Sequence, residues 1–180
     1  MRSRYRINTS QLAHFVTSTI VEWLPTFTSN AYCDIVVQSL LHCREHKGLK
    51  IYAWVLLPNH FHAILAGPDL SRTLADLKKF TAREILAQLE IERREWLLNQ
   101  LRYFRAKHKT TSEHQVWQEG VHPQSIPTDA IMLQKLEYLH NNPVKLGFVA
   151  APEHWRYSSA HEWLKGAEAV FRCDDWRQPT

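Results

Sequence analysis

"WVLLPNHFHAIL", residues 54–65, holds two apolar segments on either side of Pro58 and Asn59. The longer segments to which they belong, 49–57 and 60–67, carry apolar residues at both odd and even positions. Such a pattern is typical of strands that are covered on both faces, and a short turn between two of them favours an antiparallel pair. We therefore expect a β-hairpin in the centre of a sheet.

The second strand of this hairpin carries a pair of histidines, His60 and His62, separated by Phe61. Side chains alternate between the two faces along a strand, so both imidazoles share one face and Phe61 takes the other. Two neighbouring imidazoles on one face can bind one cation. The same spacing also fits two histidines held by ordinary hydrogen bonds, and the spacing alone does not separate these interpretations.

The remaining segments are predicted from periodicity and from cap residues. They are a strand at 14–23, a helix from Ser29 or Asn30 to Gly48, one or two helices and a basic loop at 70–109, an extended segment at 114–126, and a helix from 128 towards Pro143. Residues 151–180 show no clear period, and we expect them to wrap over the surface. The sequence has no repeat and no change of composition, so it favours one α+β domain over residues 1–180, with a core at about 10–150 and a C-terminal extension at 151–180.

Composition narrows the class of protein. The chain has 180 residues, a net charge of +4 and a sequence pI of about 9.0, which favours a polyanionic partner. No apolar run approaches the roughly 18 residues of a membrane span, and the first residues lack the apolar core of a secretory signal. The three cysteines match neither a disulfide framework nor a zinc site. We therefore expect a cytoplasmic protein.

A second candidate group lies on the helix before Pro143, where Tyr138 and Asn142 are four residues apart and share one face. An amide oxygen is a suitable third ligand for Mg²⁺ or Mn²⁺, and a tyrosine beside such a site can act as a covalent nucleophile. The alternative is that Tyr138 packs in the core and that Asn142 ends the helix. Proline also disfavours helical backbone at the residue before it, which here is Asn142. This restriction bears on whether Asn142 can approach the metal.

The chain resembles the REP-associated tyrosine transposases, which belong to the single-tyrosine HUH nucleases (HUH stands for His, bulky hydrophobic, His). The resemblance is carried by YAWVLLPNHFHAIL (52–65) followed by KLEYLHNNPVKLGFVAAPEHWRYSSA (135–160). Shorter matches are AHFVT (13–17), KKFTAREI (78–85) and VWQEGVHPQSI (116–126). It implies a ferredoxin-like α+β domain whose central antiparallel sheet carries the HUH motif and packs against helices.

The resemblance also implies the roles of the candidate residues. His60 and His62 would be metal ligands, Tyr138 would be the nucleophile, and Asn142 would complete a site for Mg²⁺ or Mn²⁺. The implied reaction is cleavage and rejoining of single-stranded DNA through a covalent 5′-phosphotyrosine intermediate. The implied substrate is hairpin-forming DNA of the repetitive extragenic type, and both a monomer and a homodimer occur among such enzymes.

Basic residues on the predicted helices and the following loop are candidates for contacts with DNA phosphates. They are Lys78, Lys79, Arg83, Arg102, Arg105 and Lys107, with Lys109 beyond them. Trp117 or Trp155 could stack on an unpaired base if exposed. The alternatives are a solvated helix face for the cations and a core position for the tryptophans.

Two functions of other classes stay open. A metal-dependent hydrolase would use His60, His62 and His122 with water as the nucleophile, and it would work without Tyr138. A catalytically silent regulator would bind single-stranded DNA without cleaving it. A covalent adduct between protein and DNA separates both from the transposase-like reaction.

Overall fold

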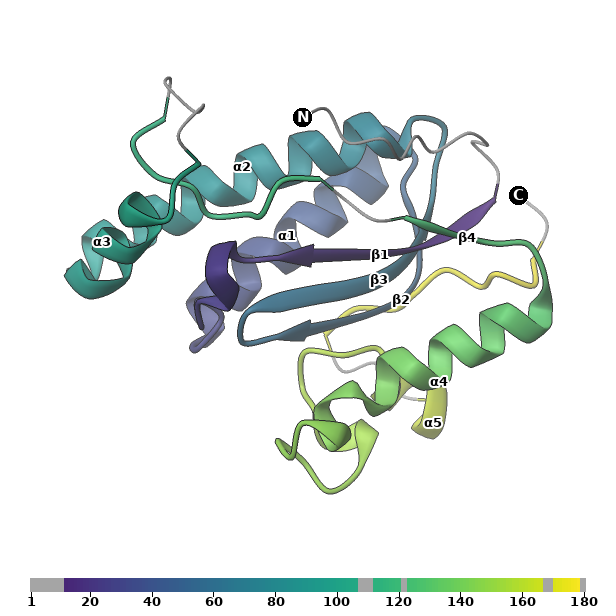
Figure 1. The fold of residues 1–180 in the computed structure, drawn as a ribbon. Helices are drawn as coiled ribbons and strands as arrows, with labels where there is room; N and C mark the ends of the chain where they lie inside the picture. The colour runs from purple at the N-terminus through teal and green to yellow at the C-terminus, as the bar shows by residue number, and fades with distance from the viewer. Residues whose placement is uncertain (1–11, 107–111, 121–122, 167–169, 179–180) are drawn as a thin grey trace.

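The computed structural model describes residues 12–106, 112–120, 123–166 and 170–178. Its elements are β1 (Ala13–Thr19), η1 (Val21–Trp23), α1 (Asn30–Lys47), β2 (Lys50–Leu57), β3 (His60–Ala66), α2 (Leu70–Ile91), α3 (Glu95–Tyr103), β4 (Gln124–Ile126), α4 (Asp129–Lys145), η2 (Pro152–His154) and α5 (Ala160–Lys165). The strands form one four-stranded sheet in the order β2-β3-β1-β4, with antiparallel neighbours (Figure 1). This is the ferredoxin-like order of strands and helices, which confirms the expected α+β fold.

The two faces of the sheet are covered by different helices. α1 and α2 pack on one face, and α4 packs on the other (Figure 1). α4 buries Met132, Leu136 and Leu139, which recur at helical spacing, against Phe15 and Val55 of the sheet. The predicted hairpin is therefore buried on both sides, but only its second strand is central, because β2 is an edge strand of the sheet. No helix of the described residues is long and apolar enough to cross a membrane.

The C-terminal extension packs along the outer edge of β2 instead of wrapping over the surface. The N–H of Leu56 donates to the carbonyl of Tyr157 (2.8 Å), and further along the edge the N–H of Asp174 donates to the carbonyl of Ile51 (2.8 Å). Tyr157 and Phe171 are buried in the main core. The extension thus supplies hydrogen-bond partners to backbone groups that an edge strand would leave unpaired. This pairing joins distant segments, so sequence periodicity does not reveal it.

The first strand is shorter than predicted. β1 ends at Thr19, and the chain then turns through η1 with left-handed backbone at Glu22 (φ 49°) and Trp23 (φ 56°). The N–H of Ile20 donates to the carbonyl of Asn59 (2.9 Å), which extends the β1–β3 register by one more pair before the chain turns. The β-branched composition of 14–23 favours a strand throughout, but the left-handed backbone at Glu22 and Trp23 ends it.

Phe171 tests whether the extension belongs to the core. Its ring is stacked on Trp54, with 5.0 Å between the ring centroids and 4° between the planes. Phe171→Ala should therefore lower the free energy of unfolding by about 3–5 kcal/mol, because it opens a cavity beside β2. Leu164→Ala, at an exposed position on α5, should change it by less than about 0.5 kcal/mol. Urea unfolding measures both, and equal losses would show that the extension is not part of the core.

Candidate functional site

The antiparallel pairing of β1 and β3 positions both histidines of the HUH motif. His62 lies opposite Thr17, and His60 lies opposite Thr19, next to the Pro58-Asn59 turn. Both imidazoles are buried on the face that α4 covers, and their ring centroids are 4.7 Å apart. Phe61 is fully buried on the other face. The alternation predicted from the sequence therefore places two adjacent imidazoles on one face.

Each imidazole is oriented through its Nδ1 atom. The Nδ1 of His60 lies 2.6 Å from the Oδ1 of Asn59, and the Nδ1 of His62 lies 2.8 Å from the hydroxyl of Thr17. The amide of Asn59 is oriented in turn, because its Nδ2 donates to the carbonyl of Trp23 (3.2 Å). An amide oxygen only accepts, so the Nδ1 of His60 carries the proton. Its Nε2 then keeps the lone pair that a cation needs, and the same tautomer of His62 fits Thr17.

The electrostatic environment keeps both imidazoles neutral. Burial lowers the pKa of His60 to about 4. Burial, followed by the charges of His60 and Lys135, lowers the pKa of His62 to about 3. A neutral imidazole is the form that binds a metal, so at neutral pH no proton has to be displaced before a cation binds.

α4 places Tyr138 beside this pair. The helix begins at a Thr128 cap, whose hydroxyl accepts from the N–H of Ile131 (3.3 Å). The ring of Tyr138 is 43% exposed, and its centroid lies 5.7 Å from that of His62. Tyr138 is therefore both accessible from solvent and adjacent to the imidazoles, as a nucleophile must be.

Asn142 lies one turn after Tyr138 on α4 and is buried. The helix does not break before Pro143 but continues to Lys145. Pro143 lies close to the end of the helix, where its missing N–H costs one hydrogen bond of the last turn. Asn142 thus has helical backbone and stays on the face of α4 that carries Tyr138.

Four residues at the site were not identified from the sequence. Lys145 lies with its Nζ 5.4 Å from the centroid of the Tyr138 ring, seven residues further along α4. Lys135 lies over Phe15 at 5.0 Å and contributes to the low pKa of His62. The other two, Thr17 and Asn59, orient the imidazoles. Helical spacing from Tyr138 was the available signal for both lysines, whereas Thr17 depends on strand register.

The basic residues predicted to contact DNA lie on α2, on α3 and just after α3, none of which is on the α4 face of the sheet. Lys78, Lys79 and Arg83 are on α2, Arg102 is on α3, and Arg105 follows α3. Lys78 donates to the carbonyls of Gln118 (2.7 Å) and Gly120 (2.9 Å), and Arg105 donates to that of Ser112 (2.8 Å). Arg83 pairs with Glu84 (2.8 Å) and Arg102 with Glu113 (2.6 Å), while Lys79 is exposed. The contact of these cations with DNA stays a prediction.

Other predicted positions have different outcomes. Lys107, Lys109 and His122 lie outside the described residues. Trp117 is buried in the core, where its Nε1 donates to Thr81 (3.0 Å). Trp155 is half-buried, donates to the carbonyl of Leu56 (2.9 Å) and is stacked on Phe148. Trp117 is therefore a core residue, and Trp155 packs against β2.

Comparison with known proteins identifies the family that the chain resembles. No protein-family model matches. A Haemophilus influenzae protein with the provisional name REP-associated tyrosine transposase is 28% identical over 132 residues, which is 73% of this chain and 69% of that protein. The solved structure of a REP-associated tyrosine transposase bound to a REP hairpin matches with a TM-score of 0.67 and 19% identity, over 97% of this chain and 93% of that chain. The chain resembles the REP-associated tyrosine transposases.

A further solved structure, from Deinococcus radiodurans and provisionally described as a transposase, has a TM-score of 0.46 and 15% identity over 77% of this chain and 96% of that chain. The resemblance expected from the HUH segment and the α4 segment is confirmed by the Haemophilus influenzae protein, and the expected fold by the hairpin-bound structure.

The resemblance implies a divalent metal, and the two neutral imidazoles are donors that such a metal could take. No group of three or more His, Cys, Asp and Glu side chains gathers anywhere in the described part of the chain. A metal at His60 and His62 would therefore need a donor of another kind, such as the amide oxygen of Asn142. Two neutral imidazoles with one amide oxygen suit Mn²⁺ at least as well as Mg²⁺, which prefers oxygen ligands.

Mn²⁺ binding tests this donor set independently of any reaction. His60→Ala and His62→Ala should each abolish binding in a calorimetric titration, because each removes a nitrogen ligand. Thr17→Val keeps the shape of the side chain but removes the hydroxyl next to His62, and it should weaken binding by about 10–100-fold. The control is Ser18→Ala, on the opposite face of the sheet. Unchanged Mn²⁺ affinity in His62→Ala would exclude the site.

Stability should depend on pH through the same histidines. Their pKa values are lowered to about 4 and about 3 in the folded state, whereas the unfolded chain binds these protons near pH 6.5. Below about pH 6.5 the unfolded state thus binds more protons, and the free energy of unfolding should fall by up to roughly 1.4 kcal/mol per pH unit for each histidine. Urea unfolding with chelator between pH 7 and 5 should show a smaller loss for the double variant His60→Gln, His62→Gln. An identical loss in both proteins would contradict these pKa shifts.

Proposed function

We propose that the protein is a metal-dependent endonuclease and strand transferase for single-stranded DNA, and that it acts on hairpin-forming repeat DNA through a covalent link to Tyr138. The observation that carries the proposal is the position of Tyr138, half-exposed on α4 and adjacent to the buried pair of His60 and His62. The resemblance to the REP-associated tyrosine transposases supports a transposase-like action on DNA.

The reaction follows from the residues at the site. The phenol oxygen of Tyr138 attacks the scissile phosphorus, the bond from phosphorus to the 3′ oxygen breaks, and the 3′ oxygen takes up a proton as the phenol loses one. The products are a 5′-phosphotyrosine and a free 3′-hydroxyl, and attack by another 3′-hydroxyl reverses the step. A bound Mg²⁺ or Mn²⁺ would polarise a phosphate oxygen and help to orient the phosphate for attack in line with the leaving oxygen.

The chain supplies positioning and positive charge for this step. α4 holds Tyr138 on a rigid element that packs on the sheet, so that the attacking oxygen keeps one orientation. The ammonium of Lys145 lies on the Tyr138 ring, where it can offset the charge of a phosphate that approaches the phenol. Lys135 adds a second positive charge on the same helix.

The substrate class rests on related proteins and on charge. A solved relative of the same fold is bound to a REP hairpin, and the net charge of +4 suits a nucleic acid. Hairpin DNA with single-stranded flanks is therefore the proposed partner. A cytoplasmic location is proposed as well, and a homodimer is compatible with the proposal but not required, because Tyr138 and both histidines come from one chain.

Tyr138→Phe tests the proposal most simply. The change removes one oxygen from a half-exposed ring, so the free energy of unfolding should barely change. Cleavage of an end-labelled hairpin with Mn²⁺ and the covalent band in denaturing electrophoresis should vanish together. Tyr103→Phe, at a 79% exposed ring on α3, is the matched control and should keep both.

The same reactions, with a native binding gel run beside the denaturing one, separate the two other functions. Cleavage by Tyr138→Phe without an adduct would favour a hydrolase that uses water. Hairpin binding by the wild-type protein with neither cleavage nor adduct, at any Mn²⁺ concentration, would favour a silent DNA-binding regulator. Either result would contradict the proposed function.

A further inference from the structure

Trp23 is an exposed aromatic residue that lies against the metal-ligand pair. It ends η1, its side chain is 55% exposed, and its ring centroid lies 5.3 Å from that of His60. The next spacings are 4.7 Å from His60 to His62 and 5.7 Å from His62 to Tyr138. Each ring therefore contacts the next, and Trp23 and Tyr138 lie at the two ends of this row of four rings, with both imidazoles between them.

The backbone at Trp23 is held in an unfavourable conformation. Glu22 and Trp23 both have positive φ, a region in which each non-glycine residue costs on the order of 1–3 kcal/mol. Because the indole is exposed, burial of its apolar surface offsets little of this conformational cost. Asn59 holds the turn by accepting from the N–H of Ile20 (2.9 Å) and by donating to the carbonyl of Trp23 (3.2 Å). Because Asn59 also contacts His60, the indole and the imidazole share one rigid support.

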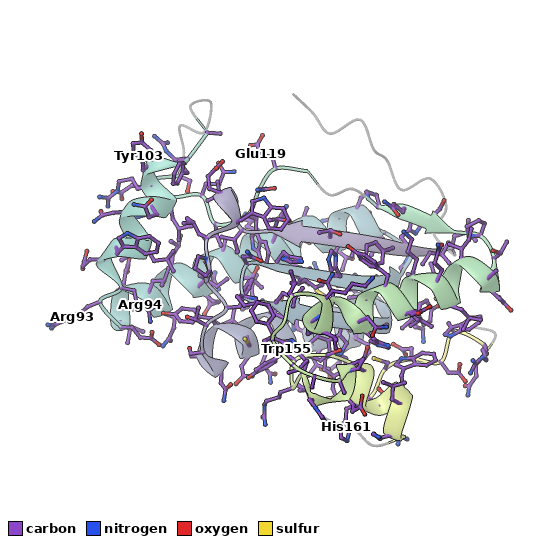
Figure 2. All side chains as sticks on the ribbon, turned by 60° about the horizontal axis from the view of Figure 1, so that its bottom comes forward. Arg93, Arg94, Tyr103, Glu119, Trp155 and His161 are labelled. Atoms are coloured by element: carbon purple, nitrogen blue, oxygen red, sulfur yellow. The ribbon has the colours of Figure 1, made fainter. Side chains whose placement is uncertain are left out.

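Other exposed aromatic residues lack this position. Trp96 (62% exposed) and Tyr103 lie on α3, which projects past the end of the sheet (Figure 1). Figure 2 shows Tyr103 on this projecting helix and Trp155 beside α4. Phe148 is already stacked on Trp155, with 5.4 Å between the ring centroids. Among the exposed tryptophans of the described residues, Trp23 alone contacts a histidine of the HUH motif.

We propose that Trp23 is the platform on which the base immediately 5′ to the scissile phosphate stacks. The inference rests on the proposed function and makes it more specific. In-line attack requires the leaving oxygen to lie on the side of the phosphorus opposite the attacking phenol. Tyr138 attacks from one end of the row, so the nucleotide that carries the leaving 3′ oxygen lies towards the other end. An exposed indole there can stack on any unpaired base.

The role of Trp23 is to position the leaving strand. Stacking would hold the last nucleotide of that strand after cleavage, when its 3′-hydroxyl has to stay in place for the reverse reaction. Because every base has an aromatic face, Trp23 contributes affinity for single strands without strong sequence preference. A paired base is already stacked on its neighbours, so the platform also favours an unpaired flank over a duplex.

The test measures hairpin binding with chelator present and in a Tyr138→Phe background, so that neither metal nor cleavage contributes. The probe is a DNA hairpin with a single-stranded flank, in which one abasic site is moved along the flank. Trp23→Ala should weaken binding by about 5- to 150-fold, the range expected for one base stacked on an aromatic ring. Trp23→Phe should keep most of the affinity, Trp23→Leu should not, and Trp96→Ala should bind as tightly as the parent.

A double-mutant cycle identifies the stacked base. At one position the abasic site should weaken binding to the parent, and Trp23→Ala should then cause no further loss, because both changes remove the same contact. In the wild-type background this position should lie directly 5′ to the cleavage point. The inference would be overturned if the loss of affinity from Trp23→Ala multiplied with the loss from the abasic site at every position of the flank. Equal hairpin affinity of Trp23→Ala and Trp96→Ala would also overturn it.

Two controls separate other outcomes. Thermal unfolding and Mn²⁺ titration of Trp23→Ala should match the parent; a loss of Mn²⁺ affinity would mean that Trp23 supports His60 and would overturn stacking. If the wild-type protein forms a covalent adduct while Trp23→Ala binds normally, only the stacking inference fails. If the wild-type protein neither binds the hairpin nor forms an adduct, the proposed function fails, and the inference fails with it.

Discussion

The antiparallel register between β1 and β3 is the constraint on which the site depends. It pairs Thr17 with His62 and Ser18 with Phe61, so that the imidazoles lie on the α4 face and the phenylalanine on the opposite face. A slip of one residue would reverse every side chain of β3 and bury both imidazoles beneath α1 and α2. The register is held because both faces are packed cores, and Phe61 is fully buried in the core beneath α1 and α2. The requirement to bury Phe61 therefore also orients the two histidines.

The site combines buried and exposed groups at one end of the sheet. The imidazoles are buried, oriented by Asn59 and Thr17, and neutral because burial lowers their pKa. Tyr138 remains half-exposed because it lies on the outer part of a helix whose other residues fill the core. The proposed nucleophile needs access to the DNA, whereas the proposed metal ligands need a fixed geometry. The packing of α4 on the sheet meets both requirements.

Sequence reasoning succeeded where local patterns determine the structure. The hairpin was predicted from apolar residues at both odd and even positions and from its turn. The bounds of α1 were predicted from its cap positions and Gly48. Helical spacing predicted that Tyr138 and Asn142 share one face of α4. The assignment of these residues to a nucleophile and a metal site came from the family resemblance and remains a proposal.

The failures involve contacts between distant segments. The turn at Trp23 depends on Asn59, and the edge pairing of the extension depends on β2; neither leaves a periodic signal. Lys145 is a miss of another kind, because its spacing of seven residues from Tyr138 on α4 was a local signal that sequence reasoning did not use.

The central claim is that Tyr138 forms the covalent bond to DNA, and mapping the linked residue tests it most directly. The wild-type protein would be incubated with a single-stranded hairpin and Mn²⁺, digested with nuclease and trypsin, and analysed by mass spectrometry. Trypsin should release residues 136–145, LEYLHNNPVK, as one peptide with a single tyrosine. The account predicts a 5′-phosphonucleotide on this peptide, attached to Tyr138. A nucleotide on another tyrosine, or cleaved DNA with every tyrosine unmodified, would contradict it.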